Sequence, residues 1–211
     1  MIIIKLIGGL GNQMFEYAVA YVAAKHNKTE LKIDSLYYRD KSKRLHRFEY
    51  RPYALDLFNI SATCASSKEI NRFLLPRIFN KYIYYILKRF HKQWHIFTEK
   101  DITSYNKLIN LPYKDIYLNG LFQSYNFIKN DIDDLKKEFT FKEKLPDTHT
   151  DISAKIESSE ESVCVVFRRG DYVNHPFLDV VTLDFYYKAI EILKEKILTK
   201  LSIFVFSEDI E

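Results

Sequence analysis

The sequence has little cysteine, glycine and proline, and it has no long apolar run. Its 211 residues include two Cys, five Gly and five Pro. Two thiols, Cys64 and Cys164, are too few for a disulfide framework or a four-thiolate zinc site. The low glycine and proline content excludes collagen-like and low-complexity chains. No stretch reaches the roughly 18 uncharged apolar residues of a membrane-spanning helix, and the start lacks the basic segment of a signal peptide. We therefore expect a cytoplasmic protein with reduced thiols.

The residues that are present indicate an ordinary globular protein. Hydrophobic residues make up 47% and charged residues 28% of the chain, and its length suits one large domain or two small ones. The net charge of +4 is unevenly distributed, because from Lys68 to Lys100 eight basic residues stand against two acidic ones. This local excess indicates an anionic partner surface without identifying it.

The beginning of the chain reads as one β-α-β unit. Ile2 to Ile7 is a β-branched, almost continuously apolar strand, and glycines at 8, 9 and 11 follow as a turn. A helix is expected from about Asn12 to His26, and Leu31 to Asp34 is the second strand. This order predicts a parallel sheet covered by helices. The core-facing side of the helix is expected to consist of Met14, Phe15, Ala18, Val19, Val22 and Ala23.

The middle of the chain predicts further elements of the same domain. Ile116 to Leu118 is a strand candidate, and Asp131 to Phe139 is a helix whose acidic start suits a helix N-terminus. From Phe79 to Trp94, apolar aromatic residues combine with lysines and an arginine, which predicts a basic amphipathic helix. Such a helix either packs into the core or contacts an anionic membrane from the cytoplasmic side.

A polar stretch from Lys142 to Ser162 predicts a linker that has room for a short helix, after which the opening pattern returns. Val163 to Phe167 is a strand, Asp184 to Leu198 a helix and Leu201 to Phe206 another strand. We therefore expect two Rossmann-type domains, 1–145 and 146–211. The residues of the helix expected to face inward are Tyr186, Ala189, Ile190, Leu193 and Ile197.

The second domain is expected to be incomplete. Two parallel strands with one crossover helix cannot cover both faces of their sheet, and parallel sheets need both faces covered. Either the chain is a truncated form of a longer protein or a partner completes the core, and we favour truncation.

The glycine turn after the first strand is the first candidate binding site. Gly9 and Gly11 would let backbone N–H groups approach a phosphate at the helix N-terminus, and Asn12 could orient a ligand or cap the helix. As a dinucleotide fingerprint the match is imperfect, because Met14 holds the third glycine position, although Asp34 could bind a ribose. The alternative is a turn that only connects a strand to a helix.

Two polar motifs follow the strands of the second domain. Arg168 and Arg169 come directly after a buried strand, and guanidinium groups bind phosphate through two parallel hydrogen bonds. Asp171 could hold an arginine or contact the ligand. Glu208 and Asp209 follow the next strand and could accept hydrogen bonds from a guanine edge or a ribose. Because ligands of open α/β sheets bind at the carboxyl ends of the strands, these motifs predict a nucleotide site, with surface ion pairs or a solvated acidic turn as the alternative.

Four motifs together resemble a known family. GGLGNQMF at the start, YLNGLFQS from Tyr117 to Ser124, FRRGDYV from Phe167 to Val173 and FVFSEDIE at the end occur in the order and approximate spacing of the bacterial α-1,2-fucosyltransferases, glycosyltransferase family 11. The resemblance covers almost the whole chain. It implies an α/β, GT-B-like fold of two Rossmann-type domains, the first on the acceptor side and the second binding GDP-fucose.

The resemblance also implies an activity. Fucose would be transferred with inversion from GDP-fucose to the 2-hydroxyl of a galactose-type acceptor in a surface glycan such as O-antigen, with no metal, no cofactor and no nucleic-acid partner. Arg168 and Arg169 look like the diphosphate-binding pair and Asp171 like their supporting acid. Asn12, with Gly9 and Gly11, looks like the first domain's contribution to the cleft. The nucleoside contact looks like Glu208 or Asp209.

The sequence departs from the family in three places. Val166 stands where the family usually has His, and Glu208 replaces the first of two aspartates. A Ser- and Trp-containing motif that completes the family's donor pocket is absent. The residues leave two other classes open: an oxidoreductase resting on Gly9, Gly11 and Asp34, and a basic nucleic-acid-binding adaptor. The first leaves FRRGDYV unexplained, and no single-strand-binding pattern supports the second.

Overall fold

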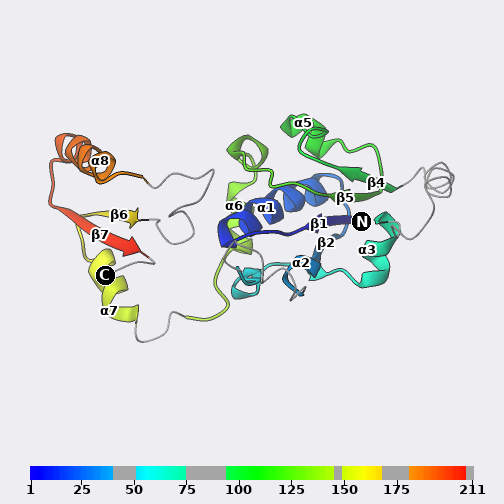
Figure 1. Ribbon diagram of the computed structural model, residues 1–211, viewed down its shortest axis with the longest axis horizontal. Helices are drawn as coiled ribbons and strands as arrows, with labels where there is room; N and C mark the ends of the chain where they lie inside the picture. The colour runs from blue at the N-terminus through cyan, green and yellow to red at the C-terminus, as the bar shows by residue number, and fades with distance from the viewer. Residues whose placement is uncertain (40–50, 75–93, 145–148, 168–180, 208–211) are drawn as a thin grey trace. The chain divides into compact units, whose positions relative to one another are not determined.

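The computed structural model describes residues 1–39, 51–74, 94–144, 149–167 and 181–207 of the chain (Figure 1). They form two compact units, Met1–Glu143 and Lys144–Glu211. The strands are β1 (Ile2–Lys5), β2 (Leu31–Asp34), β3 (Thr63–Cys64), β4 (Trp94–Phe97), β5 (Asp115–Leu118), β6 (Glu161–Phe167) and β7 (Leu201–Ser207). The helices are α1 (Leu10–His26), α2 (Leu36–Arg39), α3 (Ser67–Phe73), α5 (Tyr105–Ile109), α6 (Ile132–Glu138), α7 (Thr150–Glu157) and α8 (Leu183–Lys196), with short 3-10 turns η2 (Leu55–Leu57) and η3 (Tyr125–Phe127).

The first unit is built on a five-stranded sheet in the order β3-β2-β1-β5-β4. Every pairing in it is parallel, which confirms the expected sheet type. β1 lies at the centre, with Ile4 opposite Ile33 of β2 on one side and opposite Leu118 of β5 on the other. The carboxyl ends of β1 and β5 therefore lie next to each other at one edge of the sheet.

Side chains of β1 alternate between two hydrophobic clusters, as the two-residue period of a strand requires. Ile2, Ile4 and Leu6 belong to the larger cluster, which α1 covers. Ile3 points to the other face, where it packs with α3 residues Ile70 and Phe73 and with other buried side chains. Helices thus cover both faces, which is why the three consecutive residues Ile2, Ile3 and Ile4 are all apolar and buried.

Helix α1 is buried nearly all round, and the sequence-based expectation of one apolar face was too narrow. The helix packs on β1 and β2, on α5 and on η2. Gln13, Glu16 and Tyr17 are fully buried although none was expected in the core, whereas Met14 and Phe15 are only half-buried. A pattern of hydrophobicity cannot detect this burial because two of the three side chains are polar.

Helix α1 also begins two residues earlier than predicted. It begins at Leu10, with Gly9 as the N-cap residue and no side-chain cap. Asn12 is therefore the third residue of the helix, and the prediction that it caps the helix is wrong. Leu31–Asp34 has the predicted bounds.

Two elements of the first unit carry too weak a pattern to predict, namely β3 and β4. β3 has only two residues, and β4 follows the segment expected to be a basic amphipathic helix over 79–94. Residues 79–93 of that helix lie outside the described residues, while Trp94 begins β4, so the helical assignment is wrong at that residue.

α3 is capped by Ser66, whose hydroxyl accepts from the Glu69 backbone N–H while the Glu69 carboxylate accepts from Ser66 N–H.

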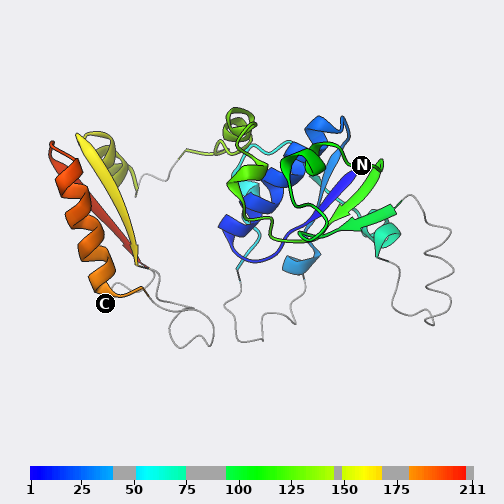
Figure 2. The same cartoon turned by 90° about the horizontal axis from the view of Figure 1, so that it is seen from above.

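The second unit contains two parallel strands, β6 and β7, in register from Glu161–Leu201 to Phe167–Ser207. Helices α7 and α8 lie on opposite sides of these strands (Figures 1 and 2). Four of the five residues expected to face inward, Tyr186, Ala189, Ile190 and Leu193, are the least exposed residues of α8, and the fifth, Ile197, is the half-buried residue that follows the helix. Coverage is nevertheless poor, since Val205 is 60% exposed and Val166 is 54% exposed. Among the described residues of this unit, only Val165 counts as buried core.

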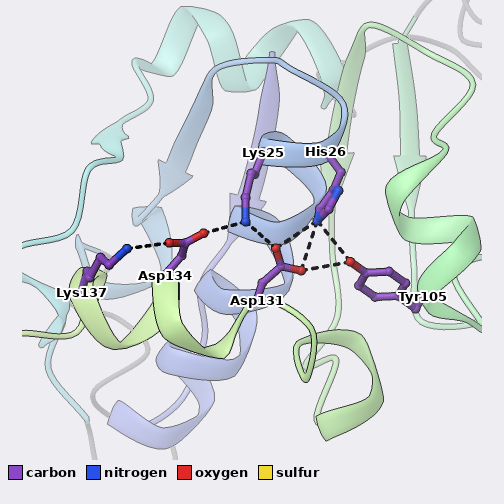
Figure 3. A network of polar contacts seen from close by, with 6 residues as sticks. All are labelled: Lys25, His26, Tyr105, Asp131, Asp134 and Lys137. Carbon is purple, nitrogen blue, oxygen red and sulfur yellow. Dashed lines mark hydrogen bonds and ion pairs between the residues drawn. The ribbon is translucent and has the colours of Figure 1, made fainter.

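A polar network joins the C-terminal end of α1 to α5 and to the start of α6 (Figure 3). The Asp131 side chain is 2% exposed and accepts hydrogen bonds from Lys25 Nζ at 2.7 Å and from Tyr105 Oη at 3.0 Å. His26 Nε2 lies 3.0 Å from the same carboxylate. Lys25 also reaches Asp134 at 2.6 Å. The Asp131 carboxylate thus links α1, α5 and α6, and these contacts attach the start of α6 to the other two helices.

These contacts change the protonation of Asp131. Burial by itself raises the pKa of a carboxyl, but hydrogen bonds from Lys25, His26 and Tyr105 outweigh it, so that the pKa of Asp131 lies below its ordinary value of 3.8. A lowered pKa means that the network stabilises the fold above the ordinary pKa and is lost as the pH falls through the folded-state value.

We expect Asp131→Ala to destabilise the first unit by about 2 kcal/mol at neutral pH, because the substitution leaves partly buried donors without their acceptor. The measurement is urea unfolding followed by the fluorescence of Trp94, the one tryptophan of the 211 residues, which lies in β4. Asp133→Ala is the matched control on the same helix, since Asp133 is 93% exposed and should contribute less than about 0.5 kcal/mol.

The difference between the wild type and Asp131→Ala should shrink as the pH is lowered from about 5 to about 3. A difference that persists unchanged at acid pH would show that the carboxylate charge is not what stabilises the packing.

Candidate functional site

The turn between β1 and α1 can be made only by glycine at its first position. Gly8 has a φ of +76°, and a Cβ there would stand 2.4 Å from the side-chain nitrogen of Asn12. Its carbonyl oxygen accepts hydrogen bonds from Gln13 Nε2 at 3.1 Å and from Tyr38 Oη at 3.0 Å. The predicted glycine turn is therefore a rigid piece of backbone, held at the carboxyl edge of the sheet.

Gln13 attaches a second loop to this turn. Its amide nitrogen also donates to Pro52 O at 2.9 Å, and its oxygen accepts from Ala54 N at 2.9 Å. The loop so held carries Arg51, whose Cγ lies 3.7 Å from where a Cβ of Gly9 would be. An arginine beside the glycine turn was not predicted, because sequence position 51 gives no indication of proximity to position 9.

Asn12 meets the second family motif. Gln123 Nε2 donates to Asn12 Oδ1 at 2.7 Å, across 111 residues of sequence. The two side chains follow β1 and β5, the neighbouring central strands. The structure therefore brings together GGLGNQMF and YLNGLFQS, and Gln123 joins the candidate site although the sequence did not single it out.

The loop that carries Gln123 is conformationally strained. Phe122 has a φ of +49°, in the left-handed region that bulky residues avoid, and is 1% exposed. Its N–H donates to Glu99 Oε1 at 2.7 Å. A Cβ at Gly120 would lie 2.8 Å from Glu99 Cγ, so a larger residue there would displace the Glu99 side chain. Strain of this kind is typical of functional sites.

Asp34, the residue on which a dinucleotide site would rest, is used internally. It is 3% exposed, and its Oδ1 accepts from Leu36 N at 2.9 Å while its Oδ2 accepts from Tyr117 Oη at 2.6 Å. Burial and this hydrogen bond raise the pKa of the Tyr117 hydroxyl, so it stays a donor. A carboxylate buried and bonded in this way supports the fold and is not available to a ribose.

Glu16 is a buried acid that the sequence did not reveal. Its side chain lies inside the turn, where Oε2 accepts from Ile7 N at 2.9 Å. Within the described parts of the chain, Oε1 has no hydrogen-bond partner. Burial raises the pKa of Glu16 to about 8, against smaller opposing effects of the Ile7 hydrogen bond and of Lys5. Glu16 is therefore mostly protonated at neutral pH.

The predicted donor-site residues Arg168, Arg169, Asp171, Glu208 and Asp209 lie outside the described residues. The strands that lead to them end side by side, because Phe167 and Ser207 are register partners and Ser207 Oγ donates to Phe167 O at 3.0 Å. Val166, where the family usually has His, is in β6 and cannot donate, accept or carry a proton through its side chain. Any contribution of that His is therefore missing here.

An apolar cavity of about 470 Å³ lies between α1 and α6, near the start of α1. Lys136 is its one charged lining residue. The cavity is lined by Gly11, Met14, Phe15, Ala18, Ile128, Ile132, Leu135, Lys136 and Phe139.

Among the residues that the structure describes, no group of three or more His, Cys, Asp or Glu side chains could hold a metal ion. No helix there is long and apolar enough to cross a membrane.

Comparison with known proteins identifies the family. The model of Glycosyl transferase family 11 matches residues 58–211. The chain belongs to glycosyltransferase family 11. The reaction class of this family member is glycosyl transfer, which replaces the oxidoreductase and nucleic-acid-binding alternatives.

Two curated relatives from Escherichia coli agree with this membership. An alpha-1,2-colitosyltransferase is 31% identical over 224 residues, which cover 100% of this chain and 70% of the relative. The O-antigen biosynthesis glycosyltransferase WbnK is 31% identical over 225 residues, covering 98% of this chain and 72% of the relative. Both alignments include the two candidate motifs of the first unit; GGLGNQMF precedes the segment matched by the family model, and YLNGLFQS lies within it.

Solved structures support the fold. The crystal structure of fucosyltransferase NodZ from Bradyrhizobium has a TM-score of 0.52 at 13% identity, covering 99% of this chain and 72% of that one. NodZ alpha-1,6-fucosyltransferase soaked with GDP-fucose has a TM-score of 0.51 at 14% identity, covering 99% and 71%. The expected α/β, GT-B-like fold class of this family 11 chain is confirmed.

We expect Glu16→Gln to make the first unit less sensitive to pH. The folded wild type holds a proton on Glu16 up to about pH 8, while the unfolded chain releases it near the ordinary pKa of 4.5. Wild-type stability should therefore fall between these values as the pH rises, by at most about 1.4 kcal/mol per pH unit for this one group. The variant should be closer to the wild type near pH 5 and more stable than it near pH 8.

The measurement is urea unfolding by Trp94 fluorescence across this pH range, with exposed Glu143→Gln as the control. Parallel pH curves for the wild type and Glu16→Gln would mean that Glu16 is ionised in the folded protein.

Proposed function

We propose that this enzyme transfers fucose, with inversion, from GDP-fucose to the 2-hydroxyl of a galactose-type acceptor in a surface glycan such as O-antigen. The observation that carries the proposal is family 11 membership combined with FRRGDYV, which follows β6 at the carboxyl edge of its sheet. Relatives named alpha-1,2-colitosyltransferase and O-antigen biosynthesis glycosyltransferase support the linkage and the class of acceptor.

In the proposed mechanism, Arg168 and Arg169 bind the diphosphate and Asp171 orients them. Breaking the bond between the sugar and GDP adds negative charge to the leaving diphosphate. Two fixed guanidinium groups stabilise that charge where other enzymes use a metal ion. Glu208 or Asp209 would contact the nucleoside, since β6 and β7 end at neighbouring points. No metal or other cofactor is required.

The first unit would bind the acceptor. Asn12 stands at the carboxyl edge of the central strand, and Gly9 and Gly11 lie at the start of α1, where no side chain caps the helix. Its amide can both donate to and accept from a ligand hydroxyl. The enzyme would act in the cytoplasm, with the basic segment around residues 68–100 available for peripheral contact with anionic lipids.

A second donor is favoured by one observation, the relative named for colitose. Colitose is fucose without the 3-hydroxyl. Discrimination between the two donors therefore depends on whether the sugar pocket forms a hydrogen bond with that hydroxyl. A site that hydrogen-bonds the hydroxyl rejects the analogue that lacks it, whereas an apolar pocket discriminates far less.

The test is transfer by the full-length enzyme from GDP-fucose, GDP-colitose and GDP-mannose to a β-galactoside, with and without EDTA. We expect GDP-fucose to have the highest kcat/KM and EDTA to leave the rate unchanged, because the arginines supply the positive charge. A preference for GDP-colitose would establish the second candidate. Loss of transfer on chelation, restored by manganese or magnesium, would contradict the two-arginine mechanism.

Arg168→Ala should lower kcat/KM for transfer by about 10²–10³, equivalent to roughly 3–4 kcal/mol of transition-state stabilisation. Arg168→Lys should restore little of this, since an ammonium group cannot form two parallel hydrogen bonds with one phosphate. Steady-state kinetics measures the loss, and circular dichroism checks that the fold is retained. Near-wild-type transfer by the alanine variant would refute the assignment.

A further inference from the structure

We propose that Gln123, paired with Asn12, forms a binding site for a ring hydroxyl of the acceptor sugar. The proposal rests on the function proposed above, because it takes the ligand to be a galactoside. It adds a residue that neither the motif analysis nor the family assignment singles out. The site is the pair of side-chain amides at the carboxyl ends of β1 and β5.

The first argument is the pairing itself. Gln123 is exposed, yet its amide is held at 2.7 Å from Asn12 Oδ1. The bond links loops that follow adjacent central strands, so it lies where open α/β sheets bind their ligands. An ordinary surface glutamine keeps its rotamer freedom. Gln123 gives up that freedom because the hydrogen bond to Asn12 holds its side chain in one position.

The second argument is what the pairing leaves open. A glutamine amide has two donor hydrogens and an oxygen acceptor, and asparagine has the same. In the described parts of the structure, the hydrogen bond to Asn12 is the one that the Gln123 side chain makes, and Gln123 Oε1 and Asn12 Nδ2 have no protein partner. The pair therefore presents an acceptor and a donor together, which matches a hydroxyl that both donates and accepts.

The third argument is the strain that positions Gln123. Phe122, its predecessor, is buried with a φ of +49° and is held by Glu99 through its N–H. Ser124 N also donates to Phe122 O at 2.8 Å, which closes the turn around this residue. A left-handed phenylalanine costs free energy, so the surrounding contacts must fix the loop. What the loop presents at that cost is the side chain of Gln123.

The ligand class follows from the charge of the pair. Both side chains are neutral, and neither can supply the charge-assisted bonds that a diphosphate needs. Neutral amides suit neutral hydroxyls, and the donor phosphates are already assigned to Arg168 and Arg169 of the second unit. We therefore assign the amide pair to the acceptor sugar.

The experiment measures binding without the reaction. Methyl β-D-galactoside is titrated into the full-length wild type, Gln123→Ala and the control Asn106→Ala, and the dissociation constants are measured by NMR. Asn106 is an exposed amide on α5, away from the carboxyl edge. We expect Gln123→Ala to raise the dissociation constant about five- to tenfold, as loss of one neutral hydrogen bond predicts, and Asn106→Ala to leave it unchanged.

Deoxygenated analogues separate a direct contact from an indirect effect. The 2-, 3-, 4- and 6-deoxy galactosides are titrated into the same variants as a double-mutant cycle. The penalty of Gln123→Ala should disappear for the analogue that lacks the contacted hydroxyl. An equal penalty for all analogues, no penalty for the parent sugar, or no binding of the galactoside by the wild type would each overturn the inference.

Kinetics with GDP-fucose distinguishes this inference from the proposed function. If it holds, Gln123→Ala raises the acceptor KM and leaves the GDP-fucose KM unchanged. A wild type that transfers fucose while Gln123→Ala retains its acceptor KM would refute the inference alone. A wild type that binds the galactoside through Gln123 but does not use GDP-fucose would refute the proposed donor alone.

Discussion

The parallel pairing of β1 with β5 is the constraint on which the first unit depends. It places Ile4 opposite Leu118, so that two segments more than a hundred residues apart end at the same edge of one sheet. Everything assembled at that edge, from the glycine turn at Gly8 to the strained loop at Phe122, depends on this register. A shift by one residue would move the Ile2–Ile4 side of β1 away from α1 and separate Asn12 from Gln123.

Buried polar side chains of α1 hold the glycine turn of the candidate site in place. Gln13 satisfies the carbonyls of Gly8 and Pro52 and the N–H of Ala54, groups that would otherwise lose water without a partner. Glu16 does the same for Ile7 N–H, at the cost of a buried carboxyl with an unpaired oxygen. The unpaired oxygen of Glu16 lowers the stability of the fold, while Gln13 and Glu16 together hold the turn in one conformation. Such a local cost is common where backbone must be positioned for a ligand. At the opposite end of the helix, the Asp131 network fixes α6 without this cost because its acid is paired (Figure 3).

The second unit has a different balance. Its two strands are in register over seven residues, yet most of their side chains are partly exposed, so hydrophobic burial contributes little. The Tyr186 and Phe167 rings are in contact, with their centroids 4.2 Å apart and their planes tilted by 31°, and the Tyr186 hydroxyl donates to Val166 O. These two contacts hold α8 near the end of β6. That end leads directly to Arg168. The aromatic contact of this unit therefore involves Phe167, the residue that directly precedes Arg168 in the sequence.

The sequence by itself determined the elements with strong periodicity and the family. β2, β5, α6 and the inward side of α8 were predictable, because apolar residues recur there at the period of a strand or helix. Four ordered motifs identified glycosyltransferase family 11 and led to the candidate residues of the second unit. What a periodic pattern cannot contain is contact between distant positions. The tertiary structure alone placed Gln123 against Asn12, Arg51 beside Gly9 and Asp34 inside a hydrogen-bonded core, and it alone revealed Glu16 and Gln13 as buried. The physical reason is that polar side chains carry no hydrophobic signal, so their burial is decided by which strands pair and which loops those strands bring together.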